Sequence, residues 1–354
     1  MTARQNETCG YRTPSTEVAS LFDAPPLPVF KIAPDSRHVL VLQPVGLAAL
    51  ADLARPEWRL AGLRFDPASR SHDGCGGYAA LELIEVAGGR RRAVTGLPGK
   101  ARVSAALWSP DGAAVAFALH EDDRLTPWMA TLENPRARRL ADLPLHAVAG
   151  APFRWLPDSS GLLCRVAVSD AMPAPSAAPA GPVLFEHAGG PPAAARTCPD
   201  LIKTDYDEAC FEWAMASEIV SVCRRGAVRR YGVRGAITTV EPSPDGRYML
   251  VHAFCRPYSR MVPHHRFAMR IEVLDMSGKS IRVLADLPAA ESMSLAFDAV
   301  RTGPRSCGWR ADRPSTLCWF EARDGGDPDA DTDLRDACML LEAPFDGPAR
   351  VLMH

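Results

Sequence analysis

The sequence has 354 residues, and its 40 basic and 42 acidic side chains leave a formal charge of −2. This balance lacks the cationic surplus with which proteins bind phosphate backbones or anionic bilayers, so we expect neither a nucleic-acid partner nor a membrane partner. No window holds 18 consecutive apolar residues, and residues 1–20 are polar rather than a basic end followed by an apolar stretch. We therefore expect a soluble, cytoplasmic protein.

The ten cysteines are scattered along the sequence, and no two have the spacing C-x-x-C. This spacing argues against zinc sites and dithiol redox sites. Several of them, including Cys164, Cys223 and Cys318, stand in apolar strand-like runs, where a free thiol behaves as a small hydrophobic side chain. We predict mostly reduced, structural cysteines.

From the N-terminus, we expect residues 1–27 to form an extension and residues 28–354 to form repeated units. One short phrase recurs, and each copy precedes a strand-like run. Proline fixes φ at the second position of a tight turn, aspartate can bond the backbone two residues on, and glycine accepts a positive φ, so the phrase predicts a hairpin turn. The copies are Ala33-Pro34-Asp35-Ser36, Trp108-Ser109-Pro110-Asp111-Gly112, Trp155-Leu156-Pro157-Asp158-Ser159, Pro242-Ser243-Pro244-Asp245-Gly246 and the weaker Trp309-Arg310-Ala311-Asp312.

After each turn, apolar residues alternate with others, as in a half-buried strand. A second phrase closes the units at 139–144 and 283–288, with a weaker copy at 94–98. Each unit thus contains four antiparallel strands over roughly 40 to 50 residues, which is typical of a propeller blade. We predict an all-β protein, a β-propeller with about five four-stranded blades. A β-sandwich with incidental turns is the alternative, but sandwiches do not repeat both an opening and a closing phrase.

The first and third blades are enlarged by insertions. Within 44–67, an Ala/Leu-rich stretch is expected to form a short helix, and the Ala/Pro/Gly-rich stretch 171–195 is expected to form a long surface loop. Because the sequence ends where a blade closes, we expect an incomplete or open ring whose sheet edges are available for self-association. The predicted blades span residues 28–98, 104–145, 150–236, 237–289 and 296–354.

Two patterns have a structural and a ligand-binding interpretation. Trp108, Trp155 and Trp309 recur at one position of the unit, and we expect them to pack between blades rather than on a ligand. The alternating aspartates at 327–331 lack the glycine and the glutamate that a calcium loop needs at its sixth and twelfth positions. We therefore predict a solvated acidic loop there, and no metal site or other cofactor site in the chain.

Three segments go beyond a generic propeller: 53–64 with Arg55-Pro56-Glu57-Trp58, 252–270 with Arg256-Pro257-Tyr258-Ser259, and 297–305. Together with 21–26 and 343–347, they resemble the N-terminal region of glutamyl-endopeptidase-like members of the prolyl oligopeptidase family. The resemblance runs from about Tyr11 to the end of the sequence. It implies a propeller that lies over a C-terminal α/β-hydrolase domain and limits which substrates reach a Ser-Asp-His triad.

The catalytic signature of that family is missing from this sequence. A nucleophile elbow needs G-x-S-x-G, and no two glycines here lie four residues apart. We therefore predict no catalytic residues and no enzymatic activity for the chain as encoded. The leading hypothesis is a non-catalytic propeller segment that gates or binds peptide substrate in proteolysis for a separate or lost hydrolase domain. The alternatives are a stand-alone module that binds proteins or peptides, and a truncated product without activity.

One segment, 256–270, is the best candidate for contact with a peptide or a partner domain, because it mixes cationic, aromatic and histidine side chains. Such a mixture suits acidic side chains or a polar protein interface. An irregular outer loop without a ligand is the alternative. The candidate residues are Arg256, Tyr258, Arg260, His264, His265 and Arg266.

Overall fold

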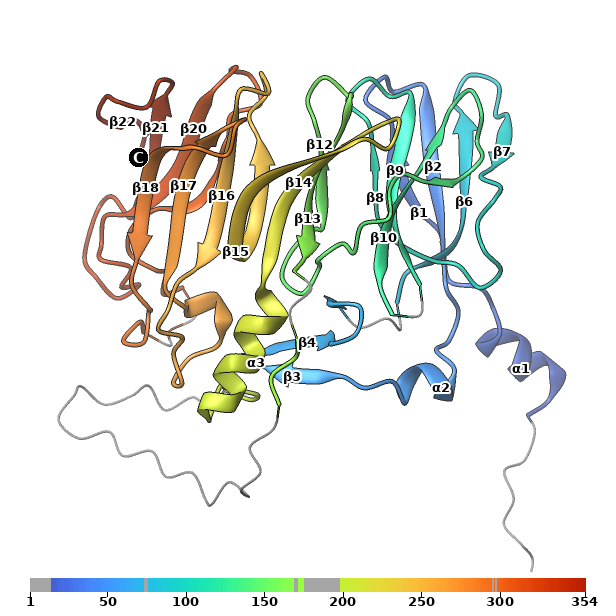
Figure 1. Ribbon diagram of the computed structural model, residues 1–354, viewed down its shortest axis with the longest axis horizontal. Coiled ribbons are helices and arrows are strands. Elements are labelled where there is room, and N and C mark those ends of the chain that lie inside the picture. The colour runs from blue at the N-terminus through green and yellow to red at the C-terminus, as the bar shows by residue number, and fades with distance from the viewer. Residues whose placement is uncertain are drawn as a thin grey trace, which may run out of the picture.

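The computed structural model describes residues 14–72, 76–121, 123–168, 171–174, 198–294, 296 and 298–354. Most of the loop predicted at 171–195 lies outside these residues. The described chain is dominated by antiparallel sheets that follow one another in chain order across Figure 1. We call each group of four successive antiparallel strands a blade and number the blades 1 to 5 along the chain; pairing between blades joins some of them into larger sheets.

Blades 1 and 2 each run in chain order from one strand to the next. Blade 1 contains β1 (Val29–Ile32), β2 (His38–Pro44), β6 (Tyr78–Glu85) and β7 (Arg91–Ala93). Blade 2 contains β8 (Arg102–Trp108), β9 (Ala114–His120), β10 (Leu125–Thr131) and β11 (Arg138–Arg139).

Blades 3, 4 and 5 repeat this order. Blade 3 contains β12 (Phe153–Trp155), β13 (Gly161–Ala167), β14 (Ser217–Cys223) and the first part of β15 (Val228–Pro242). Blade 4 contains the second part of β15, β16 (Tyr248–Phe254), β17 (Met269–Asp275) and β18 (Ser280–Leu287). Blade 5 contains β19 (Arg305–Trp309), β20 (Thr316–Ala322), β21 (Asp336–Glu342) and β22 (Arg350–Met353).

The 15-residue strand β15 belongs to two blades. It pairs with β14 as far as Gly235 and with β16 from Ala236 onward, without a turn between the two parts. In Figure 1 it is the long curved strand that passes from one sheet to the next. Blades 3 and 4 are therefore joined by continuous backbone.

The recurrent turns have the predicted chemistry. Gly112 and Gly246 adopt φ values of 67° and 69°, in the left-handed region that favours glycine. The Asp111 carboxylate accepts the N–H of Ala113 at 3.0 Å, two residues further on, and Asp245 accepts the N–H of Arg247 at 3.1 Å. Because these contacts are local, the turn sequence alone sets the hairpin.

Apolar faces of neighbouring blades pack against each other and form most of the core. Between blades 1 and 2, for example, Leu40 and Leu83 meet Phe117. Equivalent clusters of buried residues lie between blades 2 and 3, blades 3 and 4, and blades 4 and 5. No described core cluster or strand pair joins blade 5 to blade 1. The predictions of a β-propeller and of an open ring are thus confirmed.

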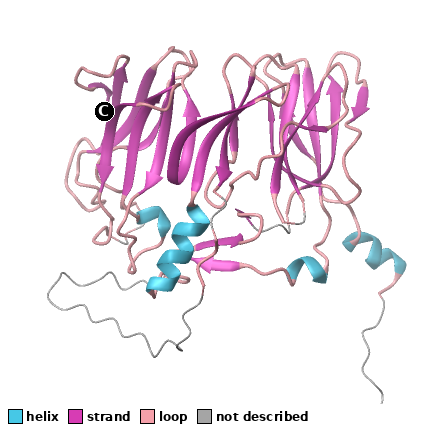
Figure 2. Cartoon of the chain, viewed as in Figure 1, coloured by secondary structure: helices cyan, strands magenta, loops and turns pink. Residues whose placement is uncertain are grey.

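A smaller layer covers one end of the blades, at the bottom of Figures 1 and 2. The short helix predicted within 44–67 is α2, and none of the described helices is long and apolar enough to cross a bilayer. The layer contains α2 (Leu50–Leu53), β3 (Trp58–Leu60), β4 (Leu63–Asp66), β5 (Ser71–His72), α3 (Asp205–Met215) and a 3-10 turn (His264–Arg266), while α1 (Thr16–Phe22) lies apart from it near the N-terminus.

Helix α3 is the main element that the sequence analysis missed. It begins at Thr204, whose hydroxyl accepts the N–H of Asp207, while the Asp207 carboxylate accepts the N–H of Thr204. This reciprocal capping was readable from the spacing Thr-x-x-Asp. The helix buries Phe211 and Met215 in a cluster with the insertion of blade 1 and with segment 254–267.

Candidate functional site

A tryptophan links neighbouring blades at three of their boundaries. It stands at the end of the first strand of a blade and donates its indole N–H to a main-chain carbonyl in the first strand of the preceding blade. This confirms the prediction that these tryptophans pack between blades. The bonds run from Trp108 to Lys31 at 2.9 Å, from Trp155 to Leu107 at 3.1 Å and from Trp309 to Glu241 at 3.0 Å.

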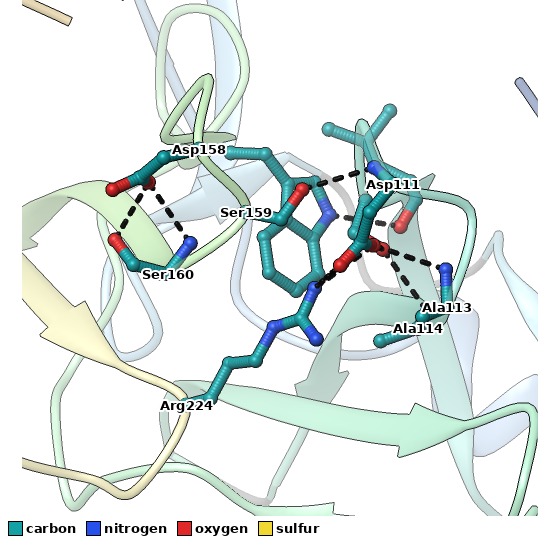
Figure 3. Close-up of polar contacts among 10 residues, drawn as sticks. Asp111, Ala113, Ala114, Asp158, Ser159, Ser160 and Arg224 are labelled. Carbon is teal, nitrogen blue, oxygen red and sulfur yellow. Dashed lines mark hydrogen bonds and ion pairs between the residues drawn. The ribbon is translucent and has the colours of Figure 1, made fainter.

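The boundary between blades 2 and 3 carries further polar contacts (Figure 3). The N–H of Asp111 donates to Ser159 Oγ at 3.0 Å, and Arg224 Nη2 donates to both Asp111 carboxylate oxygens at 2.9 and 2.7 Å. The Arg224 guanidinium also lies 5.3 Å from the ring centroid of Trp155. Burial raises the pKa of Asp111, but the bonds from Ser109, Ala113 and Arg224 outweigh it and hold that pKa below its usual value. The carboxylate is therefore a structural anion at neutral pH.

Replacing Ser159 with alanine should lower the free energy of unfolding by about 1 kcal/mol, because the Asp111 N–H loses its acceptor. Ser160→Ala is the matched control. Ser160 is exposed and its hydroxyl bonds only within its own turn, to Asp158, so we expect a change below about 0.5 kcal/mol. Chemical denaturation of both variants measures the difference, and equal effects would contradict a role for Ser159 between blades.

We call the end of the molecule that the smaller layer covers the lower end. The predicted contact segment, 256–270, lies there and packs against α3. Arg256 forms an ion pair with Glu212 of α3, and Arg260 forms one with Asp205. The side chains of the two arginines are 56% and 35% exposed. The side chain of Tyr258 points inward instead. It is buried, and its ring centroid lies 4.8 Å from that of Phe211.

The remaining candidates of that segment also have internal partners. His264 Nδ1 lies 3.0 Å from the carbonyl of Ala61 in the blade 1 insertion, and burial lowers the pKa of His264. Burial and the neighbouring His264 lower the pKa of His265. Arg266 donates to the carbonyls of Met293 and Ser294 at 3.3 and 3.4 Å. The structure thus brings the six residues to one end of the molecule, where all but His265 contact other parts of the chain. A peptide contact there stays a prediction.

Two surface pockets arise between loops that are distant in sequence. One, of about 480 Å³, lies between the turns of blades 3 and 4 and is bordered by Asp158 and Asp245. The other, of about 450 Å³, is lined by Arg301 together with Met293 and Ser294, the residues whose carbonyls Arg266 holds. Sequence reasoning found neither pocket, because no local pattern reports which loops of different blades become neighbours.

Apart from these contacts, the described residues offer few side chains arranged to bind a metal ion or another ligand. Among the residues that the structure describes, no group of three or more histidine, cysteine, aspartate or glutamate side chains is arranged to hold a metal ion. The eight cysteines within the described ranges are free thiols. The candidate functional features of the described chain are therefore the polar contacts between blades and the polar side chains at the lower end.

Comparisons with known proteins give the relationship of the chain. No protein-family model matches it. A protein of Oryza sativa subsp. japonica named "Probable glutamyl endopeptidase, chloroplastic" is 34% identical over 360 residues, which cover 98% of this chain and 38% of that protein. A protein of Arabidopsis thaliana with the same name is 34% identical over 359 residues, with coverage of 98% and 37%.

Solved structures resemble the chain more distantly. TolB from Acinetobacter baumannii has a TM-score of 0.41 and 11% identity, over 95% of this chain and 56% of that one. An acylaminoacyl peptidase from Pyrococcus horikoshii has a TM-score of 0.43 and 12% identity, over 95% of this chain and 47% of that one. The assignment of the fold therefore rests on the blades described above.

The blades and the contacts between them define this chain as an open β-propeller. Over 98% of its length, the chain is 34% identical to two proteins named probable glutamyl endopeptidase, which confirms the resemblance found in segments such as 252–270. The chain spans 38% of the length of the rice relative and 37% of the Arabidopsis one.

Proposed function

We propose that this chain is a non-catalytic propeller segment that gates or binds peptide substrate for a hydrolase domain that lies outside this sequence. One observation carries the proposal: 34% identity to glutamyl endopeptidases extends over 98% of a sequence that contains no G-x-S-x-G. We also propose a cytoplasmic location. The free thiols among the described cysteines support a reducing compartment, whereas the two plant relatives are named chloroplastic.

We propose the lower end of the molecule as the peptide-contact surface. Arg256 and Arg260 have partly exposed guanidinium groups there, and their present partners are carboxylates of α3. An acidic peptide side chain would replace one of these internal carboxylates, a like-for-like exchange of charge-assisted hydrogen bonds. The pocket beside Arg301 offers about 450 Å³ for a neighbouring side chain of the peptide.

Activity measurements on the purified chain test the absence of catalysis. We expect no labelling by a fluorophosphonate serine-hydrolase probe and no cleavage of a glutamyl peptide substrate, because an activated serine needs a base and an oxyanion hole that no motif here supplies. Light scattering and circular dichroism on the same sample check that it is folded. Labelling together with turnover would overturn the non-catalytic assignment and direct attention to an unrecognised nucleophile.

Fluorescence anisotropy with a labelled glutamate-rich peptide tests binding. The double variant Arg256→Ala and Arg260→Ala should weaken binding about three- to tenfold, since exposed ion pairs contribute about 0.2–1 kcal/mol each. Arg350→Ala is the control, because Arg350 is an exposed arginine of β22 paired with Glu342. Equal affinities of the double variant and the control would contradict the proposed contact surface.

A further inference from the structure

Every blade boundary joins two different faces. We call the face that a blade turns toward the next blade its forward face, and the opposite one its back face. The forward face of blade 2 presents Ala114, Ala116 and Ala118. The back face of blade 3 meets it with Leu162 and Cys164. Residues one position further along each strand point the other way, so Phe117 and Leu163 belong to the neighbouring clusters.

Blade 1 has a back face against which no described blade packs. Leu40 of β2 points forward into the cluster with blade 2. The back face is therefore formed by the alternate residues, with Phe30 opposite Val41 and Ile32 opposite Val39 in the β1–β2 register. Phe30 is 61% exposed and Ile32 is 69% exposed. On blade 2 the equivalent back face includes Phe117, and it is buried against blade 1.

Blade 5 has a forward face in the same situation. Leu317 and Trp319 point backward into the cluster with blade 4. Phe320 follows Trp319 in β20 and therefore lies on the forward face. It pairs with Cys338 of β21, which in turn pairs with Met353 of β22. Phe320 is 40% exposed and Met353 is 61% exposed. Within the described chain, no core cluster places another blade against these residues.

These two faces, which are only partly exposed because Val41 and Cys338 on them are buried, correspond by position to the two halves of the contact that the chain makes at its internal boundaries. The turn of blade 1 also carries a matching polar group. Ser36 occupies the position of Ser159, with φ values of 57° and 59°, and Ser159 Oγ accepts an N–H from the preceding turn. Ser36 is exposed in the turn of the first blade, and Asp312 stands in blade 5 where Asp111 stands in blade 2.

We propose that a second copy of this chain binds head to tail, with the back face of its blade 1 on the forward face of blade 5. The occupant is a second copy because the chain itself carries both complementary faces, and burial of their apolar residues favours association. The contact joins two different surfaces. Two copies can therefore close into a ring through two such contacts, and if the ring does not close, further copies add to a longer open assembly. This proposal does not depend on the proposed function.

Sedimentation velocity over a range of concentrations tests the proposal with two single variants. Ile32→Asp places a charge on the back face, and Phe320→Asp places one on the forward face. Wild-type protein should associate reversibly, and each variant alone should associate at least tenfold more weakly. An equimolar mixture of the two variants should recover association at 1:1, because one copy retains an intact forward face and the other an intact back face.

Leu47→Asp is the control, since Leu47 is 85% exposed and lies outside both faces; its association should equal that of the wild type. Circular dichroism verifies folding, and Phe30→Asp with Met353→Asp provides a second pair if either first variant fails to fold. A wild-type chain that stays monomeric would overturn the proposal. So would association that survives in both variants, or a mixture of the variants that stays monomeric.

Discussion

Replacing Phe211 with alanine is expected to lower the free energy of unfolding by about 3–5 kcal/mol. Phe211 is fully buried in α3, and its ring centroid lies 4.8 Å from that of Tyr258 and 5.4 Å from that of Phe267, both in edge-to-face geometry. The substitution removes the buried ring and these aromatic contacts and leaves a cavity between α3 and segment 254–267. Since whole domains are stable by about 5–15 kcal/mol, this loss approaches the limit of folding.

Asp205→Ala on the same helix is the control for that prediction. The Asp205 side chain is 96% exposed and its partner is the partly exposed Arg260, so we expect a loss of at most about 1 kcal/mol. Urea denaturation of the wild type and both variants provides the comparison. If Phe211→Ala is no more destabilising than Asp205→Ala, then α3 is not anchored to the blades through this aromatic cluster.

Acidification is expected to destabilise the protein from about pH 6.5 downward, because of histidines that are buried in the neutral form. His146 is fully buried, and its burial lowers its pKa to about 3, with a further contribution from the nearby Arg165. Its Nε2 lies 2.7 Å from the carbonyl of Ala214 at the end of α3. A carbonyl only accepts, so Nε2 carries the proton, and Nδ1 has no partner among the described atoms.

The direction follows from the pKa values of the two states. The unfolded chain binds a proton at His146 near pH 6.5, whereas the folded chain does so only near pH 3. The stabilisation is therefore complete above pH 6.5 and is lost as pH falls toward 3, at about 1.4 kcal/mol per pH unit for each such histidine. Burial lowers the pKa values of His120 and His252 to about 4, so they add to the loss in the upper part of this range.

His146→Gln isolates the contribution of one histidine, because glutamine retains an N–H donor but does not titrate. The free energy of unfolding of the variant should depend less steeply on pH between 6 and 4, by about one proton, even if its value at pH 7 falls. His72→Gln, at an exposed histidine, is the control. A slope that is unchanged in His146→Gln would show that His146 does not titrate on unfolding in this range.

The repeat could be read from the sequence because its signals are local. Proline, aspartate and glycine act within four or five residues, as the contacts of Asp111 with Ala113 show, so each copy of the phrase reports its own hairpin. The alternation of apolar residues then predicted the strands of each blade, and the recurring tryptophans predicted the boundaries between blades. Helix α3 lacked a comparably repeated signal, and only the capping pair Thr204 and Asp207 marked its start.

The candidate site was less readable because its contacts are distant in sequence. The arginines of segment 256–270 stand out in the sequence by composition, but the carboxylates that pair with them do not. Glu212 lies 44 residues from Arg256, and Asp205 lies 55 residues from Arg260. Which carboxylate meets which arginine depends on how α3 docks under blades 3 and 4, and single-sequence patterns do not contain that information.

The shared strand β15 has a consequence for how the molecule can be divided. A cut at any point of Val228–Pro242 breaks a strand that contributes hydrogen bonds to two sheets at once. Blades 3 and 4 should therefore exchange their protected amide hydrogens as one cooperative unit. For anyone who builds shortened, permuted or chimeric versions of this protein, these two blades form the smallest piece that has to be moved together.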